Sequence, residues 1–465
     1  MTGEPAWRWP EKPANLETVR ELVQTIGSPY ETTPPPFCYP GTPLRRELAD
    51  LAGPLLVRHL NAIGTHTHGE AQGDSWSFAE GEGGFEQIQR MEAEAVWMVA
   101  SVMGGVPATV DGFFCGGGTE ANLQGMWIGR EYLQSKIADP FEVGTAILVA
   151  PTAHYSVYKG AQLLDIARAH WEKCPRCGRK HCFESKPRHG QIFHVRLRAD
   201  GAMDPEHLME TIRSLEGGGY RRFLVVATVG VCLTGAVDPV EEIAHLLRER
   251  DNCYLHVDAS FGGFTVPFMA PEIRFGFDLP AVRSIAVDAD KMGGVPYPAG
   301  IFLCRKGLQG LVTQDVAYVN GHADDTLPGS RSAVSPVLAW YLMRSLGVSG
   351  QRAFVKKCIG ARDLLRGLLM DRFDGDERIR FWPYHKATPF LPLEVNIEDG
   401  AIPEYLRQGD GPLAPYHLRS DHIERLDGSG RDPNACPATV YKLCLMPHTI
   451  PHLERFVWDL KRAMS

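Results

Sequence analysis

The chain has 465 residues, of which 44% are hydrophobic and 22% charged, as in an ordinary soluble globular protein, so disordered and fibrous classes are excluded. Its 48 basic and 56 acidic residues give a formal net charge of −8, which argues against a nucleic-acid binder with a basic surplus. The N-terminus lacks a secretory apolar core, no apolar run approaches the roughly 20 residues of a membrane span, and the 11 cysteines are mostly scattered. We therefore expect a cytoplasmic protein with reduced thiols, no membrane and no nucleic-acid partner.

The first part of the chain is expected to be an N-terminal arm, residues 1–60, with helices at 16–26 and 44–60 joined by a proline-rich link. From about Phe85, apolar residues recur at helical spacing. Short apolar runs then alternate with helical segments: strands are expected at 146–150, 223–228, 254–257, 284–287 and 300–303, and helices at 120–136, 155–164, 205–216 and 240–250. This alternation predicts an α/β fold with a mostly parallel sheet and helices on both faces.

The pattern changes near residue 350. A helix is expected at 352–371, strands at 390–395 and 438–445, and a last helix at 450–464. These segments predict a small C-terminal α+β domain at 346–465, beside a large domain at 61–345.

A glycine-rich turn comes first among the chemically informative motifs. Gly116-Gly117-Gly118-Thr119 stands directly before a predicted helix, where free backbone N–H groups and the positive helix end suit a phosphate. The alternative is an ordinary turn in which Thr119 caps the helix. Gly117, Gly118 and Thr119 are the phosphate candidates.

Two predicted strands deliver opposite charges at their ends. Asp258 ends an apolar strand, and Lys291 follows the next strand and precedes two glycines that leave room for a bulky ring. A buried carboxylate needs a cationic partner, and a lysine in a dry site can form an imine with an aldehyde. The alternatives are a turn-capping aspartate and a surface lysine. His154, after another strand, could lie over a flat heteroaromatic ring or be a structural histidine.

In chain order these motifs are Gly-Gly-Gly-Thr-Glu-Ala-Asn, His-Tyr-Ser-Val-Tyr-Lys, Thr-Gly-Ala-Val-Asp-Pro, His-Val-Asp-Ala and Asp-Lys-Met-Gly. Their order and local sequences resemble the group II pyridoxal-phosphate (PLP) dependent amino-acid decarboxylases of fold type I, and the related sphingosine-phosphate lyase branch. The resemblance runs from about residue 61 to residue 331. It implies a PLP-dependent transferase-like fold.

The resemblance also implies roles for individual residues. Lys291 is similar to the lysine that holds PLP, Asp258 to the carboxylate at the pyridine nitrogen, and His154 to the residue that stacks on the ring. Ala259 corresponds to the small residue beneath the ring and Thr228 to a neighbour of its edge, while Gly117, Gly118 and Thr119 match the phosphate cup.

Other segments extend the resemblance beyond one chain. Residues 326–331, with Ser330, resemble the stretch through which a second subunit helps to hold the phosphate, which implies a homodimer with shared active sites. His66 and His68 resemble a loop that lines the substrate pocket.

The implied reaction is decarboxylation of an L-amino acid, a small-molecule substrate, through a Lys291 Schiff base and a quinonoid intermediate. A tyrosine on a mobile loop often reprotonates that intermediate, so Tyr318 is a candidate and His322 is its rival. The nearest alternative is a PLP-dependent carbon–carbon lyase that releases an aldehyde. Desulfination, oxidative deamination and an interaction module on an inactive PLP fold are further alternatives.

The sequence departs from the family pattern near the lysine. Asp290 replaces the usual histidine and would repel a phosphate, so it is expected to point away or to meet another cation. Val231 and Cys232 replace a usual pair of threonines. Both changes concern the substrate more than the cofactor.

One cysteine cluster has the spacing of a zinc knuckle. Cys174 and Cys177 form Cys-x-x-Cys, Cys182 adds a third sulfur, and His181, His189 or His194 could complete a tetrahedron. We expect a structural zinc insertion at 171–190 or, alternatively, a basic surface insertion with free thiols.

Overall fold

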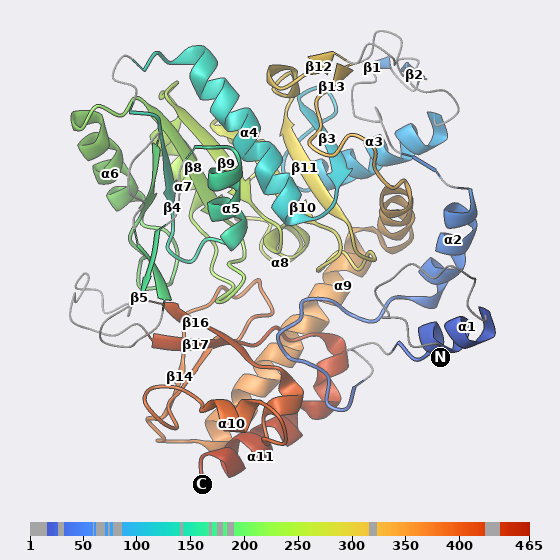
Figure 1. Ribbon diagram of the computed structural model, residues 1–465, viewed down its shortest axis with the longest axis vertical. Coiled ribbons are helices and arrows are strands. Elements are labelled where there is room, and N and C mark those ends of the chain that lie inside the picture. Colours follow the sequence, from blue (N-terminus) through green and yellow to red (C-terminus); the bar gives the residue numbers. More distant parts are fainter. Residues whose placement is uncertain are drawn as a thin grey trace, which may run out of the picture.

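The computed structural model describes the chain except for residues 1–15, 27–31, 59, 62–69, 73–74, 78–85, 140–142, 167–169, 174–179, 184–189, 316–322 and 424–437. Its described part has a large α/β body and a smaller C-terminal lobe, linked by one long helix (Figure 1).

The large body is built on one sheet. Its strands in spatial order are β3 (Val110–Cys115), β11 (Gly300–Arg305), β10 (Val282–Asp288), β9 (Cys253–Asp258), β8 (Arg222–Thr228), β4 (Thr145–Val149) and β7 (Gly190–His194). The strands from β10 to β7 pair in parallel, and β11 runs antiparallel to both of its neighbours. β3, β4 and β9 are buried along their whole length, which explains why their apolar residues run continuously rather than alternate.

Helices cover both faces of this sheet, as expected. Buried residues of α4 (Gly118–Lys136) and α5 (Tyr155–Leu163) pack on one face. The opposite face packs against α3 (Glu86–Ser101), α6 (Pro205–Gly217), α7 (Val240–Leu247), α8 (Val266–Met269) and the first half of α9 (Val334–Arg372). The α/β class with a mostly parallel sheet is therefore confirmed. β3 and β7 were not among the predicted strands.

The C-terminal lobe has its own sheet and core. Its strands are β14 (Ile379–Phe381), β15 (Leu393–Val395), β17 (Ala438–Lys442) and β16 (Arg419–Ile423), in that spatial order and all antiparallel. One face packs on α9 and on α11 (Leu453–Ala463), with the short α10 (Glu404–Arg407) beside it.

The link between the two bodies differs from the prediction. The helix expected at 352–371 begins instead at Val334, and α9 has a non-helical residue at Gly347, with φ 61°. The expected helix at 450–464 is a 3-10 turn, Pro447–His452, followed by α11, because Pro451 interrupts the first part. The domain boundary proposed at 345/346 lies beside the Gly347 kink and remains a prediction.

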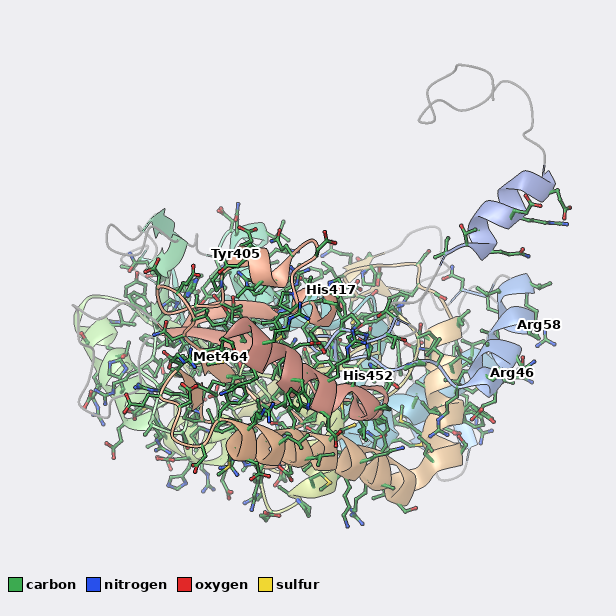
Figure 2. All side chains as sticks on the ribbon, turned by 90° about the horizontal axis from the view of Figure 1, so that it is seen from below. Arg46, Arg58, Tyr405, His417, His452 and Met464 are labelled. Atoms are coloured by element: carbon green, nitrogen blue, oxygen red, sulfur yellow. The ribbon has the colours of Figure 1, made fainter. Side chains whose placement is uncertain are left out.

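The N-terminal arm contains α1 (Leu16–Gln24) and α2 (Arg46–Val57). α1 stands clear of the body, and Arg46 and Arg58 mark α2 at its edge (Figure 2). Apolar side chains on both helices are open to solvent, including Val23, Leu56 and Val57.

Three short strand pairs complete the described elements. They are β1 (Glu70–Gln72) with β2 (Ser75–Ser77), β5 (His170–Lys173) with β6 (Lys180–Phe183), and β12 (Gln314–Asp315) with β13 (Ala323–Asp324). Among the helices of the described residues, none has the length and apolar character that a membrane crossing requires.

Candidate active site

The carboxyl ends of neighbouring parallel strands bring the predicted residues to one edge of the sheet. Asp258 is the last residue of β9, Lys291 follows β10 by three residues, and Thr228 ends β8 directly opposite Asp258. His154 follows β4, the next strand over. Open α/β sheets bind ligands at this edge.

Asp258 is buried, and both of its carboxylate oxygens accept hydrogen bonds. Oδ1 accepts from the Ser260 backbone N at 3.1 Å and from Ser260 Oγ at 2.6 Å, and Oδ2 accepts from Asn122 Nδ2 at 2.9 Å. Burial acts to raise the pKa of Asp258, but the neighbouring His154, the hydrogen bonds from Ser260 and the charge of Lys291 outweigh it and hold the pKa below its ordinary value. The site therefore keeps a charged carboxylate in a dry place.

Asn122 connects Asp258 to a chain of buried polar groups. Its Oδ1 lies 2.9 Å from His256 Nε2, and His256 Nδ1 lies 2.8 Å from Ser284 Oγ, which accepts from the Tyr254 hydroxyl at 2.9 Å. Because the amide Nδ2 donates to Asp258, Oδ1 must accept, and His256 carries its proton on Nε2. Burial lowers the pKa of His256 to about 4, so the ring is neutral. The sequence analysis assigned the motif that ends in Asn122 to the phosphate turn and did not predict this role of Asn122.

His154 is held in one tautomer. Its Nδ1 accepts from the Ser156 backbone N at 3.3 Å and lies 2.8 Å from Ser156 Oγ, which itself accepts from Asn122 Nδ2 at 2.9 Å. The proton of the neutral ring is thus on Nε2. Burial is the main cause that lowers the pKa of His154 below its ordinary value.

Lys291 is paired with an acid that the sequence reasoning missed. Its Nζ lies 2.6 Å from Asp288 Oδ2, and Asp288 is buried with no hydrogen-bond partner for Oδ1 within the described part of the chain. Burial acts to lower the pKa of Lys291, but the charge of Asp288 outweighs it and holds the pKa above its ordinary value. Burial raises the pKa of Asp288 despite the opposing ammonium. The signal in the sequence was an aspartate three residues before the lysine.

Asp290, the unusual neighbour of Lys291, pairs with a backbone amide and forms no ion pair within the described residues. Its Oδ2 accepts from the Ala299 backbone N at 2.8 Å. Burial and the charge of Asp288 raise the pKa of Asp290 to about 6. Asp290 Oδ1 has no hydrogen-bond partner within the described residues, and the expectation that Asp290 points away from a phosphate or meets another cation stays a prediction.

The glycine-rich turn lies against the same residues. Gly117 has φ 129°, a conformation that side chains rarely adopt, and it precedes Gly118, where α4 begins. A Cβ on Gly118 would lie 2.4 Å from Ser260 Oγ and 2.6 Å from Asp288 Oδ2. The turn therefore packs directly on the residues beside Asp258 and Lys291, and Thr119 follows it half-buried.

The segment expected to face a second subunit reaches β3, the strand that leads into this turn. Arg331 Nη1 donates to the Phe114 carbonyl and to Glu92 Oε1, each at 2.6 Å. Ser330, beside it, is exposed, and Ala259 is fully buried.

Two residues near Lys291 were not proposed as site residues. Lys442 Nζ on β17 donates to Cys232 Sγ at 3.1 Å, and Cys232 lies in the loop that follows β8. Cys232 was noted only as a departure from the family pattern, and Lys442 was not noted because its strand belongs to the other lobe.

Several predicted residues lie outside the described residues: His66, His68, Cys174, Cys177, His189, Tyr318 and His322. His181 and Cys182 lie on β6, where only the backbone is described. Within the described residues, no group of three or more His, Cys, Asp or Glu side chains could hold a metal ion.

Comparison with known proteins gives a family match. Residues 88–377 match the pyridoxal-dependent decarboxylase conserved domain. The chain is 33% identical over 355 residues to a probable L-tyrosine/L-aspartate decarboxylase of Methanocella arvoryzae, covering 76% of this chain and 78% of the relative. It is 31% identical over 304 residues to a tryptophan decarboxylase of Clostridium sporogenes, covering 65% and 64%.

Solved structures show the same fold at low sequence identity. A glutamate decarboxylase of Lactobacillus brevis has a TM-score of 0.74 at 16% identity, covering 99% of this chain and 95% of that one. A sphingosine-1-phosphate lyase of Burkholderia pseudomallei has a TM-score of 0.71 at 18% identity, covering 99% and 93%.

Proposed function

Because this chain belongs to the pyridoxal-dependent decarboxylase family and is a PLP-dependent amino-acid carboxy-lyase, we propose that Lys291, Asp258 and His154 perform its reaction. The observation behind this proposal is the meeting of a half-buried amine, a buried carboxylate and an imidazole at one sheet edge. Their roles below belong to the same proposal.

The residues present fit PLP. Asp258 remains charged although it is buried, so it suits a protonated pyridine nitrogen, which is a cation of matching size. The side chain of Lys291 is 22% exposed and can meet an aldehyde. When bound, PLP supplies an electron sink for the pair of electrons that carbon dioxide leaves behind.

Lys291 must lose a proton before its Nζ can bond to the aldehyde of the cofactor. Asp288 Oδ2 is 2.6 Å away and its charge holds the pKa of Lys291 above its ordinary value, so this ion pair must separate before the amine loses its proton. Asp288 thus positions the amine that would hold the cofactor.

His154 orients the ring and Asp258 fixes its charge. With Nδ1 engaged by Ser156, the imidazole of His154 keeps one orientation and offers Nε2–H to the substrate side. Ala259 would lie beneath the ring, Thr228 at its edge, and Gly117, Gly118 and Thr119 around the phosphate. Tyr318 or His322 would return the proton to the product carbon, and His66 and His68 would line the substrate pocket.

The enzyme would act as a homodimer, with Ser330 of each chain at the phosphate of the other active site. The support is the exposure of Ser330 and of apolar side chains on α1 and α2. The zinc proposal for Cys174, Cys177, Cys182 and His181 rests on their spacing alone, and metal analysis of protein purified without chelator tests it.

Replacement of Lys291 tests the proposed function. Purified wild-type protein loaded with PLP should show the visible absorbance of the bound cofactor and release carbon dioxide from an L-amino acid in a panel. Lys291→Ala should lose both, while Lys306→Ala, which removes an exposed lysine at the end of β11, should keep both. Unchanged absorbance in Lys291→Ala would refute the role of Lys291. Release of an aldehyde by the wild type, instead of carbon dioxide, would indicate a carbon–carbon lyase.

A further inference from the structure

Three acids lie around the lysine of the candidate site. Asp258 ends β9, Asp288 ends β10, and Asp290 stands directly before Lys291. The three acids are only 3%, 4% and 5% exposed, in that order. A carboxylate that is buried this deeply keeps its charge only when a cation or several hydrogen bonds compensate for the lost water.

The cations of the site account for two of these acids. Lys291 Nζ lies 2.6 Å from Asp288 Oδ2, and in the proposed function the pyridine nitrogen of PLP would face Asp258. Asp290 forms no ion pair within the described residues. A negative charge on Asp290 would therefore be buried without a cation of its own among these residues.

One hydrogen bond holds the carboxyl group of Asp290. Its Oδ2 accepts from the Ala299 backbone N at 2.8 Å, whereas Oδ1 is buried and has no hydrogen-bond partner in the part of the chain that the structure describes. Burial and the charge of Asp288 raise the pKa of Asp290 to about 6, although the Ala299 bond and the charge of Lys291 act to lower it. A further negative charge nearby would raise this pKa again and protonate Asp290 near neutral pH.

Asp290 is connected to the glycine-rich turn through Ala299. Ala299 directly precedes Gly300, the first residue of β11. A Cβ on Gly300 would lie 2.5 Å from Gly117 Cα, so the two backbones are in contact. The carboxyl group of Asp290 is thus separated from the turn by one hydrogen bond and one residue.

Asp288 also borders this turn. It is the direct cross-strand partner of Gly300, and a Cβ on Gly118 would lie 2.6 Å from Asp288 Oδ2. Burial raises the pKa of Asp288 despite the opposing charge of Lys291, and the charge of Asp258 acts in the same direction as burial. The turn at which the phosphate of PLP is proposed to bind therefore has two buried acids beside it.

A phosphate at this turn would add a strong negative charge. A phosphate monoester carries about −1.5 to −2 charges at pH 7. The N–H groups at the start of α4 suit this anion, but they leave Asp290 without compensation. Arg331, which bonds to the strand before the turn, is already paired with Glu92 at 2.6 Å. An ionised Asp290 and the phosphate would thus repel each other, and protonation of Asp290 removes that repulsion.

We propose that Asp290 takes up a proton when PLP binds, so that the glycine-rich turn receives the phosphate beside a neutral acid. The inference rests on the proposed function, because that function places the phosphate at Gly117, Gly118 and Thr119. Below about pH 6 the cofactor-free protein already carries this proton, and above that pH each cofactor that binds must bring one onto Asp290. Affinity for the cofactor therefore falls as the pH rises above this value.

The pH dependence of binding tests the inference. The probe is pyridoxamine 5′-phosphate, which has the ring and phosphate of PLP but an amine in place of the aldehyde, so it forms no bond with Lys291. Calorimetric titration of the cofactor-free, full-length wild type should give a dissociation constant that rises by up to about 10-fold per pH unit above about pH 6. Asp290→Asn, which has the same shape and no charge, should bind roughly 10- to 100-fold more tightly than the wild type at about pH 8, and equally at about pH 5.5.

Controls locate the effect at Asp290. Asp371→Asn removes an exposed acid of α9 and should keep the pH dependence of the wild type. Pyridoxamine without the phosphate should bind to the wild type and to Asp290→Asn with the same pH dependence. Asp290→Ser, a second variant without the charge, should behave as Asp290→Asn does, which separates the charge from the shape.

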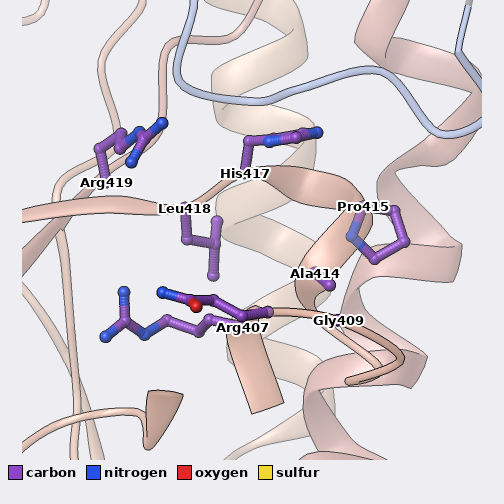
Figure 3. A pocket seen from close by; sticks show the side chains of 8 residues that line it. Arg407, Gly409, Ala414, Pro415, His417, Leu418 and Arg419 are labelled. Carbon is purple, nitrogen blue, oxygen red and sulfur yellow. The ribbon is translucent and has the colours of Figure 1, made fainter. Parts of the chain in front are cut away.

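A phosphate ester could also bind in the C-terminal lobe. Figure 3 shows a pocket of about 510 Å³ there, with Arg407 and Arg419 among its lining residues. Arg407→Met should leave the pH dependence of probe binding unchanged. A loss of that dependence in Arg407→Met would place the measured binding in this pocket and overturn the inference.

A proton count gives a second measurement. Calorimetry in two buffers with different heats of ionisation gives the number of protons taken up on binding. At about pH 8 the wild type should take up about one proton more than Asp290→Asn. Equal proton uptake, or equal pH dependence of binding in the two proteins, would refute the inference and leave the roles of Lys291 and Asp258 intact. A wild type that binds neither the probe nor PLP at any pH would refute the proposed cofactor site itself.

Discussion

Asn122 holds the polar residues of the site in one arrangement. One amide donates to Asp258 and to Ser156, and accepts from His256, so it sets the position of the carboxylate and, through Ser156, that of His154. Every side chain in this hydrogen-bond network is buried or half-buried. Each lost hydrogen bond would therefore leave a polar atom with neither a protein partner nor water. The orientation of the site thus depends on a residue that need not touch the substrate.

Replacement of Asn122 by alanine should therefore affect both stability and cofactor binding. We expect the free energy of unfolding to fall by about 1–3 kcal/mol for each buried partner left unsatisfied. Urea unfolding measures this change, and the visible absorbance during PLP titration measures cofactor affinity. Gln408→Ala is the control, since the Gln408 side chain is exposed and donates to Glu404, and an equal effect of the two changes would contradict the role of Asn122.

At the scale of elements, α4 is fitted to the sheet by glycines. A Cβ on Gly125 would lie 2.4 Å from His256 Cε1, and one on Gly129 would lie 2.8 Å from Leu224 Cδ1. This close approach lets Asn122, one turn before Gly125, reach the strand that ends in Asp258. Helix α4 therefore positions both the glycine-rich turn at its N-terminus and the hydrogen-bond network of Asn122.

Gly125→Ala should destabilise the protein although alanine is the better helix former. Overpacking costs about 1–3 kcal/mol, which exceeds the gain of about 0.5–1 kcal/mol from replacing a helical glycine. The matched control is Gly367→Ala on α9, where no atom lies within 4 Å of the added Cβ, so the same substitution should stabilise. Thermal unfolding of the two variants measures the difference, and equal melting temperatures would show that α4 moves away without cost.

At the scale of the whole molecule, the N-terminal arm leaves apolar side chains of α2 open to solvent. Leu56 and Val57 on α2 are 65% and 87% exposed, unusual for apolar residues at the end of an amphipathic helix. Exposed apolar side chains of this kind are suited to a subunit contact.

The molecular mass in solution tests the proposed homodimer. Light scattering should give twice the 51.4 kDa of one chain for the wild type. Leu56→Glu with Val57→Glu should shift the protein toward the monomer, since two charges in a buried interface cost more than they gain. Tyr405→Ala, at another exposed site, should leave the mass unchanged, and a monomeric wild type would rule out the dimer.

The sequence by itself determined the class of the fold and the central chemistry. Buried parallel strands read as continuous apolar runs, and a charged residue where such a run ends is visible without coordinates, as Asp258 and Lys291 illustrate. A glycine turn before a helix is equally local. These features are fixed by short-range patterns, and the family match agrees with them.

Only the tertiary structure decided which other side chains join them. Asn122 meets Asp258 across 136 residues, and Lys442 meets Cys232 across 210 residues, and neither distance has a local pattern. Asp290 was left with two possible environments because its partner, the Ala299 amide, lies on another segment. Packing between elements sets these contacts, so the sequence could propose Lys291 and Asp258 as site residues, while the contacts of Asp258 with Asn122 and of Cys232 with Lys442 required the fold.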